Sequence, residues 1–202
     1  MNIVPTNVLY NSSILRENLI LLNHTYPFLN IQVVGNSVLG KPIYVVKLGK
    51  GPNKVFYSGS IHANEWITSV LLMKFIENYC DTYISNDSLY GYPIRQLFNS
   101  ATIYIMPMVN PDGVDLVNGY INQNSTAYQN TIAISNRFLD IPFPSGWKAN
   151  INCVDFSNFQ HTLLINRLDW RLLCLFILFS KFLHILFFHY LLIYYHLLYL
   201  ND

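Results

Sequence analysis

The chain has 202 residues, and its 12 Lys and Arg against 11 Asp and Glu give a formal net charge of +1. This length suffices for one domain with a hydrophobic core, and the lack of any basic run argues against a nucleic-acid-binding protein. The three cysteines have no metal-site spacing, which argues against a disulfide scaffold and favours a reducing compartment.

Before residue 147 the sequence alternates between helical and strand patterns. The predicted elements are a helix over 13–26, two strands within 31–51, a strand over 54–61, a helix over 64–84 and a strand over 100–111. Ser12 or Ser13 is available to cap the first helix, and Pro27 lies beyond its end. We therefore predict an α/β fold with a mixed, largely parallel sheet and helices on both faces. Ligands of such sheets gather at the carboxyl ends of strands.

His62 and Glu65 lie where the predicted strand gives way to the helix. Two side chains separated by two residues at such a junction can reach one point. Imidazole and carboxylate are good zinc ligands, and a catalytic zinc keeps three protein ligands and an open water position. A purely structural interpretation also holds, since this spacing arises often by chance and a Glu in a first helical turn is a good capping residue.

Three segments resemble successive landmarks of the zinc carboxypeptidase family of the carboxypeptidase A type. They are "GSIHANEWITS", "NPDGV" and "WKANINCVDFSN". The likeness is stronger to the bacterial γ-D-glutamyl–diamino acid endopeptidases, which cut peptidoglycan stem peptides, and it covers residues 1–158. The resemblance implies a zinc-dependent peptidase that acts on a peptide or cell-wall stem peptide.

The resemblance also implies roles for particular residues. His62 and Glu65 correspond to the first two zinc ligands. Lys148 falls where the family often has an Arg that polarises the scissile carbonyl, so a single-point cation takes its place. Ser157 replaces an Asn that holds the substrate carboxylate, and Asn158 takes the following position.

Other family positions are structural or missing. Asp155 is expected to be structural, and residues 110–113 to form a turn near the site. The family's third zinc ligand is a distant His, and its general base is a Glu near the end of a longer domain. The histidines after residue 158 lie in no matching context, and no Glu follows Glu77. We therefore predict an inactive fragment of a zinc metallopeptidase. The alternatives are a non-catalytic, membrane-anchored binding module that retains the pocket, or an unstable product without function.

Composition changes abruptly near the end of the likeness. All nine Gly and all nine Pro precede Trp147, and Leu, Phe, Ile, Tyr and His dominate the remainder. We therefore divide the chain into a domain of residues 1–158 and an apolar tail of residues 159–202. Residues 172–200 exceed the roughly 20 apolar residues that span a bilayer, although Lys181 interrupts them.

Three interpretations of the tail stay open: a membrane anchor, a buried core helix, or translation in a shifted reading frame. We favour translation of an A/T-rich message in a shifted frame, because the tail contains no Gly, Ala, Val or Pro. The codons of these four residues all carry G or C at the first or second position. No signal peptide is recognisable at the amino terminus. We therefore expect cytoplasmic synthesis, whereas the family resemblance implies a cell-wall or spore context.

Overall fold

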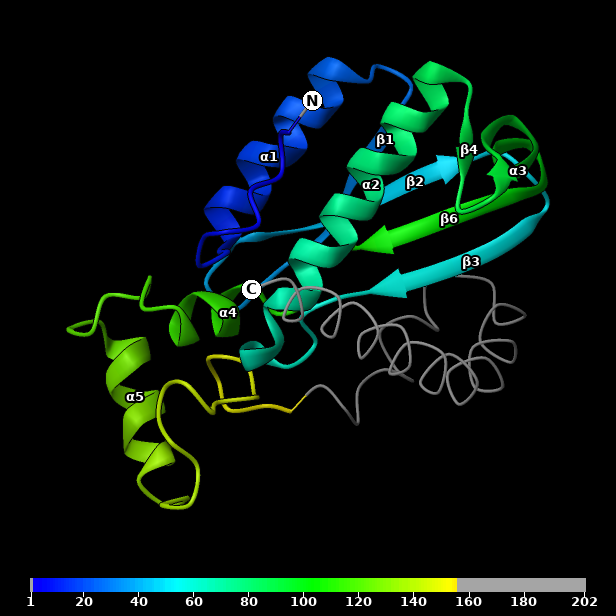
Figure 1. Ribbon diagram of the computed structural model, residues 1–202. Coiled ribbons are helices and arrows are strands. Elements are labelled where there is room, and N and C mark those ends of the chain that lie inside the picture. Colours follow the sequence, from blue (N-terminus) through cyan, green and yellow to red (C-terminus); the bar gives the residue numbers. More distant parts are fainter. Residues whose placement is uncertain (1, 156–202) are drawn as a thin grey trace, which may run out of the picture. The chain divides into compact units, whose positions relative to one another are not determined.

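The computed structural model of the protein describes residues 2–155. Its elements follow the predicted alternation of helix and strand (Figure 1). The helices are α1 (Ser12–Thr25), the short 3-10 helix η1 (Ala63–Glu65), α2 (Ile67–Ser85), α3 (Ile94–Ser100), α4 (Pro111–Val117) and α5 (Thr126–Ser135). The strands are β1 (Asn30–Asn36), β2 (Pro42–Gly49), β3 (Asn53–Ser58), β4 (Ser88–Leu89), β5 (Tyr92–Pro93) and β6 (Ala101–Met106).

The main sheet has the strand order β1-β2-β6-β3. Its β3–β6 pair is parallel, with Asn53 opposite Ala101 and Ser58 opposite Met106, while the β1–β2 and β2–β6 pairs are antiparallel. The α/β class and the mixed sheet are thus confirmed. Parallel pairing does not predominate within residues 2–155, because a short turn joins β1 to β2, whereas the longer connection through α2 returns the chain parallel to β3.

Helix α1 begins on a different residue from the one predicted. Asn11 is its N-cap, and the Asn11 Oδ1 accepts a hydrogen bond of 2.8 Å from the backbone N–H of Ile14. Ser12 cannot serve as the cap because its side chain is used elsewhere: its hydroxyl donates to Asp115 Oδ2 at 2.6 Å. Helix α2 likewise starts at Ile67, after η1, rather than at residue 64.

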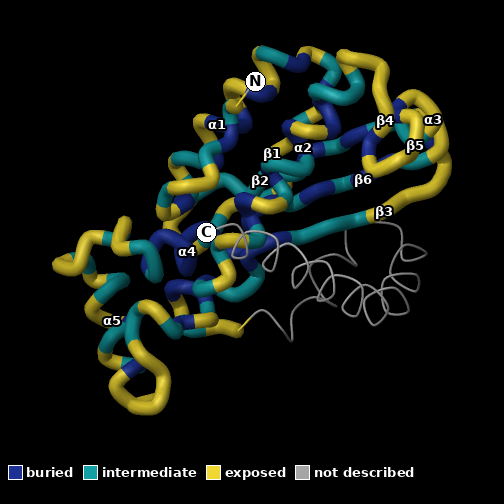
Figure 2. The backbone as a smooth tube through the Cα atoms, in the orientation of Figure 1, coloured by how far each residue is buried: buried dark blue, intermediate teal, exposed yellow. Residues whose placement is uncertain are grey.

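The main core lies between the sheet and helices α1 and α2. Helices α1 and α2 lie on one face of the sheet (Figure 1), and buried residues, dark blue in Figure 2, occur along both helices and the strands beneath them. The buried core includes Leu19 and Leu22 of α1, Met73 and Ile76 of α2, Val46 of β2 and Ile105 of β6. Burial of such side chains is the main stabilising contribution to the fold. Helical cover of the other face stays a prediction.

A second, smaller cluster lies beyond the carboxyl ends of β3 and β6. Its buried members are Ala63 of η1, Leu116 of α4, and Trp147 and Ile151 of the last described loop. Segments far apart in the sequence therefore meet where the sequence predicts a ligand site (Figure 1).

Within residues 2–155 the longest apolar helix falls short of what a bilayer span requires. Three predictions concern residues outside the described part of the chain. They are the membrane span of residues 172–200, the domain boundary after residue 158, and the roles of Ser157 and Asn158.

Candidate metal centre

Beyond β3 the chain continues through a tightly packed turn. Gly59 extends the pairing between β3 and β6: its N–H donates to the Met106 carbonyl at 2.9 Å, and its own carbonyl accepts from Val109 N–H at 3.0 Å. A Cβ at Gly59 would lie 2.7 Å from the Pro107 carbonyl oxygen. Ser60 then adopts a positive φ of 47°, and its hydroxyl lies 2.6 Å from that of Ser69. This turn directs the chain away from the sheet into η1.

His62 and Glu65 lie at the start and end of η1, and their side chains face each other. His62 is the N-cap of η1 in an extended conformation, and its Nδ1 lies 2.9 Å from Glu65 Oε1. The two side chains are 24% and 48% exposed, so both remain accessible from solvent. The predicted pair is therefore brought together at the carboxyl end of β3.

Asp155 lies on the other side of the His62 ring. Its Oδ1 is 3.8 Å from His62 Nε2, which places a carboxylate on each side of the imidazole. A carboxylate beside the second ring nitrogen of a metal-binding His fixes the orientation of the ring. The structural role expected of Asp155 stays a prediction, and the structure adds that this residue lies beside His62. The sequence could not reveal this contact, because nothing in the local sequence places residue 155 beside residue 62.

Lys148 is brought to the same region by its backbone. Its carbonyl accepts a 2.9 Å hydrogen bond from the N–H of Ala63, the residue after His62. The neighbouring Trp147 is buried and packs edge-on against Phe143, with ring centroids 5.7 Å apart. The Lys148 side chain itself is exposed, and its predicted role at the scissile carbonyl stays a prediction.

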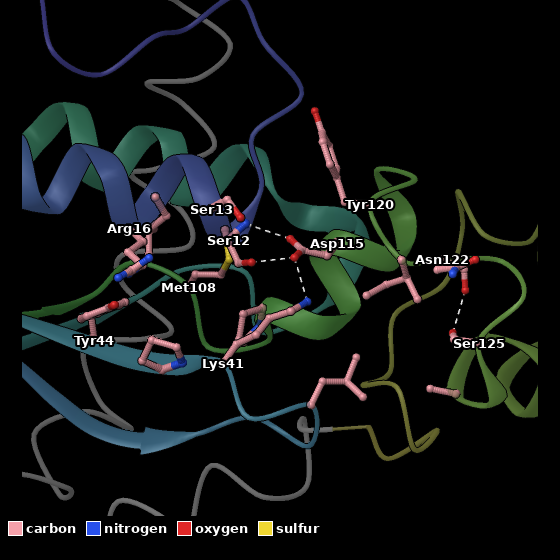
Figure 3. A pocket seen from close by; sticks show the side chains of 16 residues that line it. Ser12, Ser13, Arg16, Lys41, Tyr44, Met108, Asp115, Tyr120, Asn122 and Ser125 are labelled. Carbon is pink, nitrogen blue, oxygen red and sulfur yellow. Dashed lines mark hydrogen bonds and ion pairs between the residues drawn. The ribbon is translucent and has the colours of Figure 1, made fainter.

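Asn110 and the two acidic residues of α4 connect this region to the rest of the fold. Asn110 caps α4 by accepting from Gly113 N–H at 3.0 Å, so the predicted turn over residues 110–113 is in fact the first turn of a helix. Asp115 accepts from Ser12 and from Lys41 Nζ, the latter at 2.7 Å (Figure 3). These contacts could not be predicted, because they join residues that lie far apart in the sequence.

The donor set fits part of a zinc site. Zn–N and Zn–O bonds are about 2.0–2.2 Å long, so one ion can contact both His62 Nδ1 and Glu65 Oε1 across their 2.9 Å separation. Among residues 2–155 no group of three or more His, Cys, Asp or Glu side chains could hold a metal ion. Within residues 2–155 the predicted ligands are thus a pair, His62 and Glu65, without a third ligand residue beside them.

Comparison with known proteins identifies the family of the chain. The model of the zinc carboxypeptidase family matches residues 15–158. The chain is similar to the γ-D-glutamyl-L-diamino acid endopeptidase 1 of Lysinibacillus sphaericus, with 37% identity over 74% of this chain and 37% of that protein. It is also similar to carboxypeptidase E of Caenorhabditis elegans, with 38% identity over 43% of this chain and 19% of that protein.

The fold has a counterpart among solved structures as well. The crystal structure of thrombin activatable fibrinolysis inhibitor superposes with a TM-score of 0.52 and 20% identity, over 70% of this chain and 29% of that one. The chain thus spans less than two-fifths of the length of these relatives. The family match covers most of the chain, and we conclude that the protein belongs to the zinc carboxypeptidase family, whose members use zinc.

Proposed function

We propose that this chain carries the first part of a zinc metallopeptidase site, in which His62 and Glu65 are the first two zinc ligands. The observation that supports the proposal is the 2.9 Å approach of His62 Nδ1 to Glu65 Oε1 beyond the carboxyl end of β3. Asp155, 3.8 Å from His62 Nε2, restrains the ring so that Nδ1 stays directed at Glu65.

Besides the two proposed ligands, Lys148, Ser157 and Asn158 would take part in peptide hydrolysis. Bound zinc supplies a Lewis acid and lowers the pKa of water toward about 7. Lys148 contributes a positive charge that stabilises the carbonyl oxygen as negative charge develops on it. Because an ammonium group is a point charge, it orients that oxygen less strictly than a guanidinium would. Ser157 and Asn158 are proposed to hold the substrate.

The substrate that we propose is a peptide of the cell-wall stem type, cleaved next to a γ-D-glutamyl residue. The 37% identity to a γ-D-glutamyl-L-diamino acid endopeptidase supports this choice. We also propose a cell-wall or spore context, by analogy with the family.

Activity of this chain by itself is proposed to be low. Residues 2–155 provide no third ligand for the pair, and the sequence has no Glu after Glu77 to act as a general base. Metal-bound water still needs a group that accepts its proton. We therefore expect measurable zinc binding together with poor peptide hydrolysis.

Zinc binding to the purified full chain tests the proposal. We expect about one zinc ion per chain, as one such site implies, and at least a tenfold loss of affinity in His62→Ala, measured by competition with a chromophoric chelator. His24→Ala is the matched control, because His24 is an exposed histidine in the last turn of α1, and its affinity should equal that of the unmodified chain. Equal zinc uptake by the unmodified chain and His62→Ala would remove the ligand assignment.

A further inference from the structure

The side chain of Asn110 connects the loop that carries His62 to the loop that carries Lys148. Its Nδ2 donates to the carbonyl of Ile61 at 3.5 Å and to the carbonyl of Ala149 at 3.2 Å. Ile61 immediately precedes His62, and Ala149 immediately follows Lys148. Asn110 is 2% exposed, so water cannot easily replace these two bonds. One amide group therefore bridges the two loops.

The helix that holds Asn110 is itself fixed on its other side. Asp115 accepts from Ser12 N–H at 2.8 Å and from Lys41 Nζ at 2.7 Å, as Figure 3 shows. Asp112 accepts from Leu39 N–H at 2.9 Å and lies 3.3 Å from Lys41 Nζ. These contacts attach α4 to the start of α1 and to the turn between β1 and β2. The position of Asn110 is thus set by the body of the domain.

No free space separates α4 from η1. A Cβ on Gly113 would lie 2.5 Å from Asn110 Nδ2 and 2.7 Å from the Ala63 Cβ. Ala63 is fully buried, and its N–H donates to the Lys148 carbonyl. The Asn110 bridge and the Ala63–Lys148 hydrogen bond therefore hold the same two loops at neighbouring points.

We propose that Asn110 is a positioning residue that sets the distance between the His62–Glu65 pair and Lys148. Helix capping alone does not explain an Asn at this position, because Asp or Ser would cap α4 equally well through a side-chain oxygen. Only the amide of Asn caps the helix with its oxygen and bridges two carbonyls with its nitrogen. The part of this inference that concerns zinc rests on the proposed function.

Two substitutions separate bridging from capping. Asn110→Asp keeps the shape and the capping oxygen but turns a second oxygen toward two carbonyl oxygens, which repels both loops. Asn110→Ser keeps a capping oxygen and removes the bridging donor without adding charge. Asn118→Asp is the matched control, because Asn118 Nδ2 donates to the Tyr10 carbonyl at 2.8 Å from the opposite end of the same helix.

The experiment measures two quantities on the full chain: hydrogen exchange of the Ala63 amide without metal, and zinc affinity. In both Asn110 variants we expect Ala63 to exchange at least about tenfold faster and zinc to bind about 10–100-fold more weakly, as is usual when a group that orients metal ligands is removed. Asn118→Asp should leave the Ala63 exchange rate and the zinc affinity within about twofold of the unmodified chain. We expect its melting temperature to fall by about as much as in the Asn110 variants.

The outcomes distinguish this inference from the proposed function. Ala63 exchange in the Asn110 variants equal to that in Asn118→Asp would overturn the positioning role, whatever the zinc result. Faster Ala63 exchange in Asn110→Asp and Asn110→Ser alone, in a chain that takes up no zinc, would support the positioning role and refute the metal site. Should Asn110→Asp fail to fold, Asn110→Ser decides on the same criteria.

Discussion

Tyr79 on α2 is a buried residue with a polar group that is poorly accommodated. Its side chain is fully buried, and its hydroxyl has no hydrogen-bond partner among residues 2–155. Burial, together with the neighbouring Cys80 and Tyr83, raises the pKa of Tyr79 from 10.0 to about 12. The folded state therefore favours the neutral phenol.

We predict that Tyr79→Phe is stabilising at neutral pH and reduces sensitivity to alkali. Removal of an unsatisfied buried hydroxyl should raise the free energy of unfolding by about 1 kcal/mol. A folded-state pKa above the unfolded value gives a contribution that is complete below about pH 10 and is lost as the pH rises toward 12. Urea unfolding at pH 7 and at several values between pH 9 and 12 measures both effects. A variant with an unchanged slope of stability against pH would contradict this.

Individual site residues differed in how far the sequence revealed them. His62 and Glu65 could be predicted because they are three apart at a strand–helix junction, so local geometry alone brings them together. Asp155 and Asn110 could not be placed, because their contacts with His62 and Ile61 depend on how distant loops pack. A chemically ambiguous residue such as Asn carries no signal in the sequence that separates a capping role from a bridging role.

At the scale of elements, the turn between β3 and η1 depends on one glycine. A Cβ on Gly59 would lie 2.7 Å from the Pro107 carbonyl oxygen, 3.0 Å from Leu72 Cδ1 and 3.1 Å from the Thr68 carbonyl carbon on α2. By contrast, a Cβ on Gly35 in β1 would meet no atom within 4 Å. The two glycines therefore form a matched pair, one in a packed turn and one with open space.

We predict that Gly59→Ala lowers the free energy of unfolding by about 1–3 kcal/mol, because the added methyl group clashes with backbone atoms that cannot move independently. Gly35→Ala should change it by less than about 0.5 kcal/mol. Thermal and urea unfolding of both variants measure the difference. Equal stabilities for the two variants would show that the turn at Gly59 can relax.

The ends of the helices, like the contacts of the site, depend on residues that are distant in the sequence. The helix over residues 13–26 was predicted from its apolar spacing, but its cap was assigned to Ser12 or Ser13 rather than Asn11. Asp115, more than a hundred residues away, engages the Ser12 hydroxyl and N–H and leaves Asn11 as the cap. Within residues 2–155 only the β3–β6 pair is parallel, which the sequence could not predict, because strand alternation does not reveal which strands become neighbours.

At the scale of the whole molecule, the part of the chain that matches the family and the tail after it differ in amino-acid composition. The family model matches residues 15–158, whereas all Gly and Pro precede residue 147. We predict that a one-base shift of the coding sequence near codons 156–160 restores Gly, Pro and acidic residues downstream. Resequencing of the coding DNA checks this. A downstream frame that still encodes almost only Leu, Phe, Ile and Tyr would exclude a frameshift.

The arrangement of the metal-binding loops has a consequence for synthesis of the protein. His62 and Glu65 lie three residues apart in the sequence, whereas the loop of residues 148–155 contacts their region through the Ala63 N–H, the Asn110 side chain and the approach of Asp155 to His62. On the ribosome, the donor pair is therefore complete long before that loop has been translated. The order of assembly is thus imposed by chain polarity: the proposed ligands emerge first, and the loop of residues 148–155 arrives afterwards.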